Sequence, residues 1–299
     1  MQPNWQDRGC SLLDSMCRNG LLLVPELVSW SDPTQSDSSN RINAVQRRIC
    51  FTELSTEELP EHIEAFGGFC LEFTIESLRA LGALPVIYVP DKISDTSLHD
   101  AVGTSMLANL AASAAVLSSF AEFLTLAGPT TFVDVTMRAT GIKTTHNFDV
   151  NQTIAIRQFL EAVAVAQGIP FHEMRNALHG MSSLFYPTEN NKYTDSLGYY
   201  RQREWCIFSG PYVNGEPTTF QATDIQAEEL LKLDGEFFSR QLDFADGRYT
   251  LAIKSHFLRE IGTRHVLSHA RRILVPHKSL KAAAEILERY SITVQVAPI

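Results

Sequence analysis

Residues 67–90, GGFCLEFTIESLRALGALPVIYVP, contain the clearest change of element type in this sequence. We expect a strand over FCLEF, a short helix over IESLRALG that ends at Gly82, and a second strand over LPVIYV. A strand, a helix and a strand in such quick succession indicate a sheet that is covered by helices. The stretch therefore favours a mixed sheet.

Apolar segments nearer the end of the chain are expected to join this sheet. The predicted strands are WCIFSG (205–210), RYTLAI (248–253), RILVP (272–276) and ITVQVAP (292–298). Between the last two, Ser279 begins a helix, SLKAAAEILERY, whose apolar residues fall on one stripe. The chain is therefore expected to end as a strand, a helix and a strand.

The middle of the chain is predicted to be helical. One helix covers the uncharged segment 101–121, and a second runs over about 151–167 before a glycine. We therefore predict a single α+β domain over residues 1–299, in which strands from the N- and C-terminal parts form a mixed sheet. An all-helical block is inserted at about 96–181.

Segment 101–121 is about long enough to span a membrane. Its residues are mostly Ala, Ser, Thr, Gly and Asn, whereas a spanning helix is rich in Leu, Ile, Val and Phe. We therefore expect a buried, closely packed helix and no membrane segment. The first residues also lack the basic and apolar regions of a signal peptide.

Charge and cysteine content exclude several classes of protein. The 25 basic and 34 acidic residues give a net charge of −9, which disfavours nucleic acid as a main partner. The five cysteines form no C-x-x-C pair, which indicates reduced thiols in a cytoplasmic protein. They are Cys10, Cys17, Cys50, Cys70 and Cys206.

The usual motifs for nucleotide and ester chemistry are absent. The chain has no G-x-x-x-x-G-K-[ST], G-x-G-x-x-G or G-x-S-x-G motif. His265 and His269 have the i, i+4 spacing of two ligands on one helical face, and His256 precedes them. Without an acidic or cysteine partner at a recognisable spacing, we assign no metal site to these histidines.

Residues 48–90 resemble the abortive-infection AbiGi family and the related DUF2971-type proteins. Those proteins have a Cys-Phe-x-acid strand end, a helix with a histidine, an aromatic-Gly turn, and a strand with the pattern Pro-Val-x-Tyr-Val. The matching residues are Cys50, Phe51, Glu53, His62, Phe66, Gly67, Pro85, Val86, Tyr88 and Val89.

Two later segments extend the resemblance to about a third of the chain. YYRQREWCIFSG is similar to the family's aromatic-x-Glu-Arg-Glu-Trp-Arg strand, with Arg203, Glu204 and Trp205 in register, and RRILVP is similar to its late apolar strand. Members usually begin with a strand that carries His-Phe/Tyr-Thr, and residues 1–9 lack this motif. A first-strand histidine with a late glutamate is similar to the layout of ADP-ribosyltransferase folds, in which these residues hold NAD.

The resemblance and the residues together define the candidate site. A carboxylate beside a ribose can accept a hydroxyl hydrogen bond and stabilise an oxocarbenium-like centre. The candidate catalytic residues are Glu204, His62 and Glu53, and the candidate ligand-binding residues are Arg203, Tyr88 and Trp205. A structural role remains open for five of them: an ion pair for Glu204, a carboxylate partner for Arg203, a helix cap for Glu53, a sheet-margin position for Tyr88 and core packing for Trp205. For His62 a functional and a structural role both stay open.

The resemblance implies a cytoplasmic bacterial protein of anti-phage defence, of the abortive-infection or toxin–antitoxin kind. In the leading hypothesis it is a regulator that binds a toxin or another defence component, which suits the missing His-x-Thr strand. The alternative is an ADP-ribosyltransferase-like enzyme that uses NAD or another small nucleotide, with Glu204 as its key carboxylate. A third hypothesis, a metal-dependent enzyme using His62, Glu53 and the late histidines, has less support.

Overall fold

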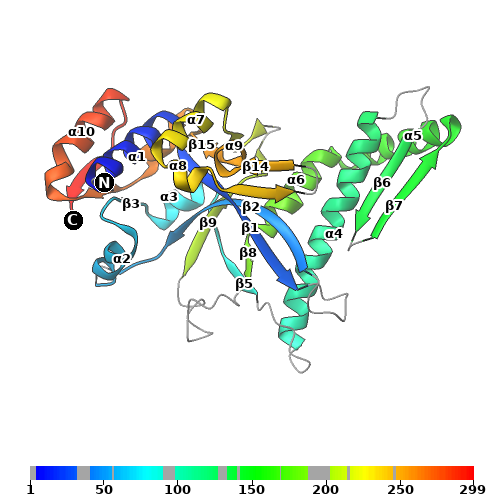
Figure 1. Ribbon diagram of the computed structural model, residues 1–299, viewed down its shortest axis with the longest axis horizontal. Helices are drawn as coiled ribbons and strands as arrows, with labels where there is room; N and C mark the ends of the chain where they lie inside the picture. Colours follow the sequence, from blue (N-terminus) through cyan, green and yellow to red (C-terminus); the bar gives the residue numbers. More distant parts are fainter. Residues whose placement is uncertain are drawn as a thin grey trace.

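A computed structural model describes ten segments of the chain, and Figure 1 shows that they form a body and an arm. The body contains the main sheet and most of the short elements, and the arm contains the elements between residues 98 and 182. The described residues are 5–31, 41–55, 57–89, 98–126, 133–139, 142–168, 170–187, 203–213, 216–244 and 247–299.

The body is built on a curled six-stranded sheet in which every pairing is antiparallel. In spatial order its strands are β12 (Phe220–Gln221), β15 (His256–Leu258), β1 (Leu21–Ser31), β2 (Arg41–Thr52), β9 (Glu204–Phe208) and β4 (Leu84–Pro85). Strands from the two ends of the chain are therefore neighbours, and the α+β class is confirmed. The expectation of a mixed main sheet was wrong, because no helical crossover joins two of its neighbouring strands in parallel.

A separate three-stranded sheet is the mixed one. Its order is β19 (Gln295–Pro298), β18 (Arg272–Val275) and β3 (Cys70–Glu72). Strand β18 runs parallel to β19, across helix α10 (Leu280–Arg289), and antiparallel to β3. The predicted strand–helix–strand ending is confirmed. The opening stretch, however, is divided between sheets, because β3 and β4 flank helix α3 (Ile75–Ala80) without pairing with each other.

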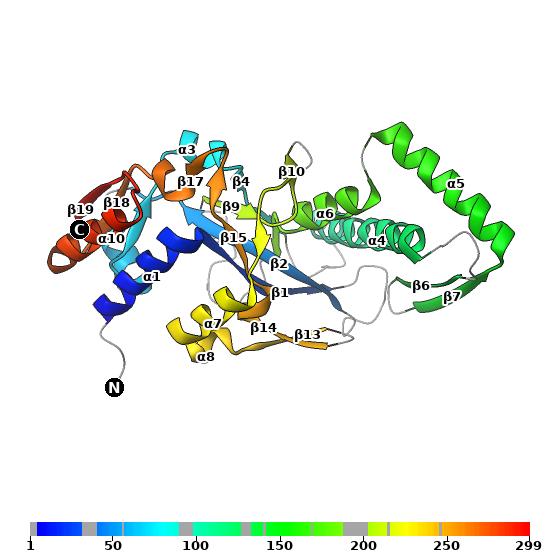
Figure 2. The same ribbon diagram turned by 90° about the horizontal axis from the view of Figure 1, so that it is seen from above.

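Helices close the body on both sides of the main sheet (Figure 2). Leu13 of α1 (Trp5–Asn19) packs with Leu258, Ile273 and Leu287 in the largest core cluster. A second cluster joins β15 to α7 (Asp224–Leu233), α8 (Gly235–Phe238) and α9 (Leu251–Lys254). Because α9 begins at Leu251, the strand predicted over 248–253 is wrong in its second half.

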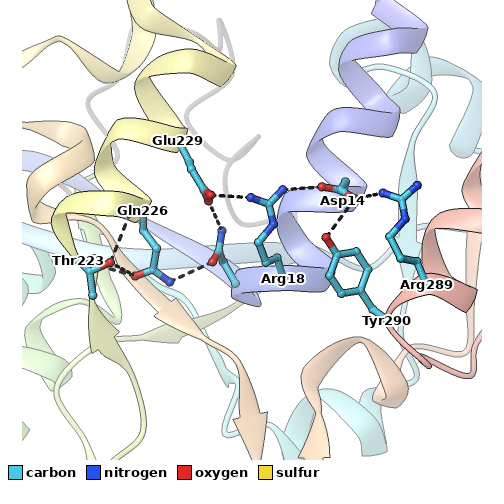
Figure 3. A network of polar contacts seen from close by, with 8 residues as sticks. Asp14, Arg18, Thr223, Gln226, Glu229, Arg289 and Tyr290 are labelled. Atoms are coloured by element: carbon cyan, nitrogen blue, oxygen red, sulfur yellow. Dashed lines mark hydrogen bonds and ion pairs between the residues drawn. The ribbon is translucent and has the colours of Figure 1, made fainter.

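A polar network joins three of these helices at the surface (Figure 3). Asp14 of α1 accepts hydrogen bonds from Arg18 at 2.6 Å, Arg289 at 3.0 Å and the Tyr290 hydroxyl at 3.2 Å. Arg18 also donates to Glu229 of α7 at 2.6 Å. The network therefore joins α1 to two helices that lie more than 200 residues away from it in sequence.

Further short elements complete the body. They are α2 (Leu59–Phe66), β5 (Ile87–Val89), β8 (Phe185–Pro187), β10 (Tyr212–Val213), β11 (Glu216–Pro217), β13 (Gln241–Phe244), β14 (Gly247–Thr250), β16 (Glu260–Ile261), β17 (Arg264–His265) and the 3-10 turns Val266–His269 and His277–Ser279. Strands β5 and β8 pair in parallel and place Tyr88 beside Tyr186.

The arm consists of three helices and a hairpin. Its elements are α4 (Leu98–Leu126), β6 (Val133–Ala139), β7 (Ile142–Phe148), α5 (Val150–Gln167) and α6 (Phe171–Ser182). The block was predicted to be all helical, and the antiparallel β6–β7 hairpin corrects this. Position 96, given as the start of the block, lies outside the described residues. Phe123, Leu160 and Phe171 form a core cluster within the arm.

The arm joins the body where α4 and α6 meet the main sheet. Leu107 of α4 packs with Trp30 of β1 and Phe185 of β8. The buried Gln46 amide of β2 donates to the carbonyl oxygens of Ser182 at 2.8 Å and Phe185 at 3.1 Å. Apolar packing and the buried hydrogen bond to Ser182 therefore anchor the arm.

Helix α4 differs from the buried helix predicted from the sequence. Of the residues from Ser105 to Thr125, only Leu107, Ala114 and Phe123 are buried. By length and composition this segment is a candidate to cross a membrane, although the core helix of a globular protein passes the same test. The absence of a membrane segment stays a prediction.

Candidate functional site

Tyr88 and Glu204 meet on one face of the main sheet. Glu204 begins β9 of this sheet, and Tyr88 lies on β5, which follows β4 in the chain and pairs with β8 outside the main sheet. The Tyr88 hydroxyl donates a hydrogen bond of 2.7 Å to Oε2 of Glu204. Burial, and then this hydrogen bond, raise the pKa of the Tyr88 phenol, so that it stays a donor at neutral pH. Two of the six predicted residues are therefore brought into direct contact.

Three further residues extend this pair along the sheet. The rings of Tyr88 and Tyr186 meet edge to face, with centroids 6.4 Å apart, and the Arg48 guanidinium lies 4.4 Å from the Tyr186 ring centroid. Arg48 forms an ion pair of 3.1 Å with Glu26, which also accepts a hydrogen bond of 3.3 Å from the Tyr186 hydroxyl. We call Glu26, Arg48, Tyr88, Tyr186 and Glu204 the tyrosine–carboxylate cluster.

The cluster combines a buried cation with an accessible acceptor. The Arg48 side chain is only 7% exposed, and it also donates to the carbonyl oxygen of Ser183 at 3.3 Å. Glu204 is half-buried, and within the described part of the chain only its Oε2 has a hydrogen-bond donor. Its second oxygen is therefore able to accept a hydrogen bond from a bound hydroxyl group.

Glu53 and Trp205 lie on the opposite face of the sheet. Trp205 follows Glu204 in β9, and successive strand residues point to opposite faces. Trp205 packs against the largest core cluster, and its indole Nε1 donates to Oε1 of Glu53 at 2.8 Å. Glu53 therefore fixes a core tryptophan, and the helix-cap role considered for it is not observed, since Glu58 precedes α2.

Arg203 lies at the surface beside this second pair. Its guanidinium donates to Glu58 at 3.2 Å, which confirms the predicted carboxylate partner, and both side chains are half exposed. The Ser55 backbone N–H, and then Arg203, hold the pKa of Glu58 below its usual value. Arg203 also adopts a positive φ of 45°. Its contacts are those of an exposed ion pair at a strand end.

His62 does not complete a catalytic set. On α2 its ring packs against Phe66, with ring centroids 4.6 Å apart. Among the described residues no hydrogen bond joins it to Glu53 or Glu204. The three candidate catalytic residues are therefore divided among two faces of a sheet and a separate helix. The acid–histidine pair that an NAD site of the transferase type needs is not formed by these residues.

The late histidines also act separately. His256 lies 3.3 Å from the Thr219 hydroxyl, and His265 accepts a hydrogen bond from the Leu267 backbone at 3.2 Å. Burial, and then Arg47 and Lys254, lower the pKa of His256 to about 4. Within the described ranges no group of three metal-ligating side chains occurs. The metal-dependent hypothesis gains no support from these positions.

Sequence reasoning did not single out Glu26, Arg48 or Tyr186. A signal was present for the first two, since each is a charged residue next to apolar strand residues, and a charge in a half-buried strand needs a partner. Tyr186 gave no such signal, because its role depends on the pairing of β8 with β5.

No family model, curated protein or solved structure matches the chain. The similarity to abortive-infection proteins therefore depends on the sequence motifs alone.

Proposed function

We propose that this protein is a partner-binding component of a bacterial abortive-infection system, and that the arm carries the surface that its partner contacts. The motifs in residues 48–90 and 203–205 supply the biological class. The observation that supports partner binding is the solvent-facing side of α4. It presents a continuous uncharged stripe of Ser105, Met106, Asn109, Ala112, Ser113 and Val116.

This stripe has the composition of a contact surface. Met106 is 50% exposed and Val116 is 42% exposed, and the exposed residues between them are small and uncharged. The solvent face of a helix is normally charged, which keeps it hydrated. Phe159 on α5 is 66% exposed and adds a large apolar side chain to the same arm. Exposed apolar area of this kind is typical of protein interaction sites.

The test uses the full chain, co-expressed with the product of the neighbouring gene. The double variant Met106→Asp, Val116→Asp introduces two charges into the stripe and is expected to abolish both co-purification and protection against phage in a plating assay. The control is Ile225→Asp, at an exposed apolar position on α7 of the body, which should leave both unchanged. Partner binding and protection that survive the double variant contradict the proposal.

Two other possible occupants of the stripe, a second copy of the chain and a lipid surface, are distinguished by further measurements on the same variants. A second copy of the chain would appear as a dimer in light scattering that the double variant converts to monomer. A lipid surface would appear as flotation with phosphatidylglycerol-containing vesicles that the double variant loses. Either result, without a protein partner, overturns the proposal.

The second candidate is an ADP-ribosyltransferase-like enzyme, and the Tyr88–Glu204 hydrogen bond is the observation that favours it. Glu204 has an oxygen able to accept a ribose hydroxyl, although no histidine accompanies it among the described residues. A ligand that binds only the folded state raises the melting temperature. A rise with NAD that is lost in Glu204→Gln supports the enzyme, and no rise with NAD or other nucleotides counts against it.

A further inference from the structure

Cys50 of β2 and Cys206 of β9 lie directly opposite each other in the main sheet. The hydrogen bonds on either side of them show which kind of pair they form. Glu53 N donates to Arg203 O at 3.3 Å, and Ser209 N donates to Arg47 O at 2.9 Å. The odd-numbered residues of β2 therefore form the hydrogen-bonded pairs, and Cys50 belongs to a non-hydrogen-bonded pair.

This kind of pair brings two side chains closest together. Opposite Cα atoms in a non-hydrogen-bonded antiparallel pair are about 4.5 Å apart. Disulfides join Cα atoms roughly 4.4–6.8 Å apart. The two thiols also point to the same face of the sheet, because residues directly opposite each other share a face. A bond between them needs no change in the strand register.

The two thiols differ in their access to solvent. Cys50 is exposed, whereas Cys206 is fully buried and its Sγ lies 4.0 Å from the carbonyl oxygen of Ser183. Burial raises the pKa of both thiols, to about 11 for Cys50 and about 12 for Cys206, so the order of reaction follows from their access to solvent and not from their acidity. A reagent in solution therefore meets Cys50 first, and Cys206 is placed to react only with what Cys50 carries. Cys70, by contrast, lies opposite Leu274 on β18.

We propose that Cys50 and Cys206 are a reversible oxidation site, which forms a cross-strand disulfide by exchange with a small-molecule disulfide such as oxidised glutathione. The Cys50 sulfur loses its proton and attacks the small disulfide, whose bond breaks and releases one thiol. The Cys206 sulfur then loses its proton, attacks Sγ of Cys50 and releases the second thiol. Two protein thiols lose two electrons in total, and one small disulfide becomes two thiols.

The position of this bond connects it with the tyrosine–carboxylate cluster. Glu204 lies two residues from Cys206 on β9, and Arg48 lies two residues from Cys50 on β2, all on one face. Oxidation therefore links the strand that carries Glu204 to the strand that carries Arg48. The proposal is independent of the partner-binding function, because the arm stripe contributes no residue to it.

The experiment is an equilibrium of the full chain in buffers of oxidised and reduced glutathione, followed by thiol blocking and tryptic digestion without reductant. Cys50 lies in peptide 49–79 and Cys206 in peptide 204–232. Because peptide 49–79 also contains Cys70, the reference protein is Cys70→Ser. We expect the two peptides to be linked in oxidising buffers and separate after dithiothreitol. Linkage that never forms, or glutathione attached to Cys50 without linkage, overturns the proposal.

Two variants test the roles of the two thiols. In Cys206→Ala, Cys50 should keep bound glutathione and the linked peptide should disappear. In Cys50→Ser, the buried Cys206 should stay unmodified. Modification of Cys206 in Cys50→Ser contradicts the order of reaction. The peptide mapping of Cys70→Ser needs no change at a buried position, so it remains decisive if Cys206→Ala fails to fold.

Discussion

The body and the arm bury their apolar residues to very different degrees. In the body, Leu21, Leu258 and Ile273 are at most 1% exposed, and strands from both ends of the chain hold them. Among the arm residues whose burial is described, a small cluster around Leu160 joins α4, β7, α5 and α6, while the stripe on α4 stays in solvent. Since burial of apolar area is the main stabilising contribution to folding, the body, with most of the buried core residues that the structure describes, carries most of the stability.

A leucine-to-alanine substitution in each region is expected to show the largest difference in stability between the body and the arm. Leu258→Ala removes a side chain that is 1% exposed in the body, and should lower the free energy of unfolding by about 3 kcal/mol. Leu160→Ala, at a position 4% exposed in the arm, should loosen the arm locally. Urea unfolding followed by tryptophan fluorescence reports chiefly the body, because all three tryptophans lie outside residues 98–187, although Trp30 also packs against Leu107 of α4.

Hydrogen exchange provides the second readout for this pair. Leu160→Ala is expected to speed exchange in α4, α5 and α6 while the fluorescence transition keeps its midpoint. If Leu160→Ala lowers that midpoint as much as Leu258→Ala does, the two regions unfold as one unit and the comparison fails.

Acid should destabilise the body through His256. Above pH 6.5 this histidine is neutral in both the folded and the unfolded state. As the pH falls, the unfolded histidine takes up a proton near its ordinary pKa of 6.5, whereas the folded one does so only near its pKa of about 4. Stability is therefore lost between these two values, by about 2 kcal/mol after allowance for partial exposure.

The difference between two urea titrations isolates this contribution from the carboxylates. From pH 7 to pH 4.5 the native chain should lose more free energy of unfolding than His256→Gln does. His172→Gln, at an exposed position on α6 of the arm, is the control and should behave as the native chain. Equal losses in the native chain and His256→Gln would show that His256 does not titrate in this way.

Local signals in the sequence predicted the local elements well. The Asn19–Gly20 pair ends α1, and the φ of 93° at Gly20 explains the glycine, since a Cβ there would lie 2.2 Å from the carbonyl oxygen of Leu258. The terminal strand–helix–strand unit was also correct. The β6–β7 hairpin was missed although polar and apolar residues alternate over 133–139, because the long apolar helix before it suggested a helical block.

The candidate site could be predicted only in part, because it is formed by contacts between segments that are distant in sequence. The motif around Glu204 and Trp205 singled out both residues, but only the pairing of β9 with β2 and β4 shows that Glu204 faces Tyr88 while Trp205 enters the core. The Cys50–Cys206 pair was hidden for the same reason. A separation of 156 residues carries no spacing signal, and the pair emerges only from the strand register.

Substitutions in the charge networks of the body and the arm are expected to change the free energy of unfolding least. Asp14 joins α1 to α10 through hydrogen bonds from Arg289 and Tyr290, so Asp14→Asn, which removes the charge, should cost the body about 1 kcal/mol. In the arm, Glu161 pairs with Arg157 one helical turn away at 2.8 Å, and both side chains are exposed. Glu161→Gln should therefore cost about 0.3 kcal/mol, and less at high salt.

The two variants distinguish a charge that joins different helices, Asp14, from a charge that pairs within one helix, Glu161. Asp14→Asn should lower the midpoint of the fluorescence transition, because its partners lie on helices that part when the body unfolds. Glu161→Gln should leave that midpoint unchanged and alter only the exchange of α5. An equal or larger effect of Glu161→Gln on the midpoint would mean that the arm contributes to the stability of the body, and the exposed stripe on α4 would then need an explanation other than a loosely coupled binding surface.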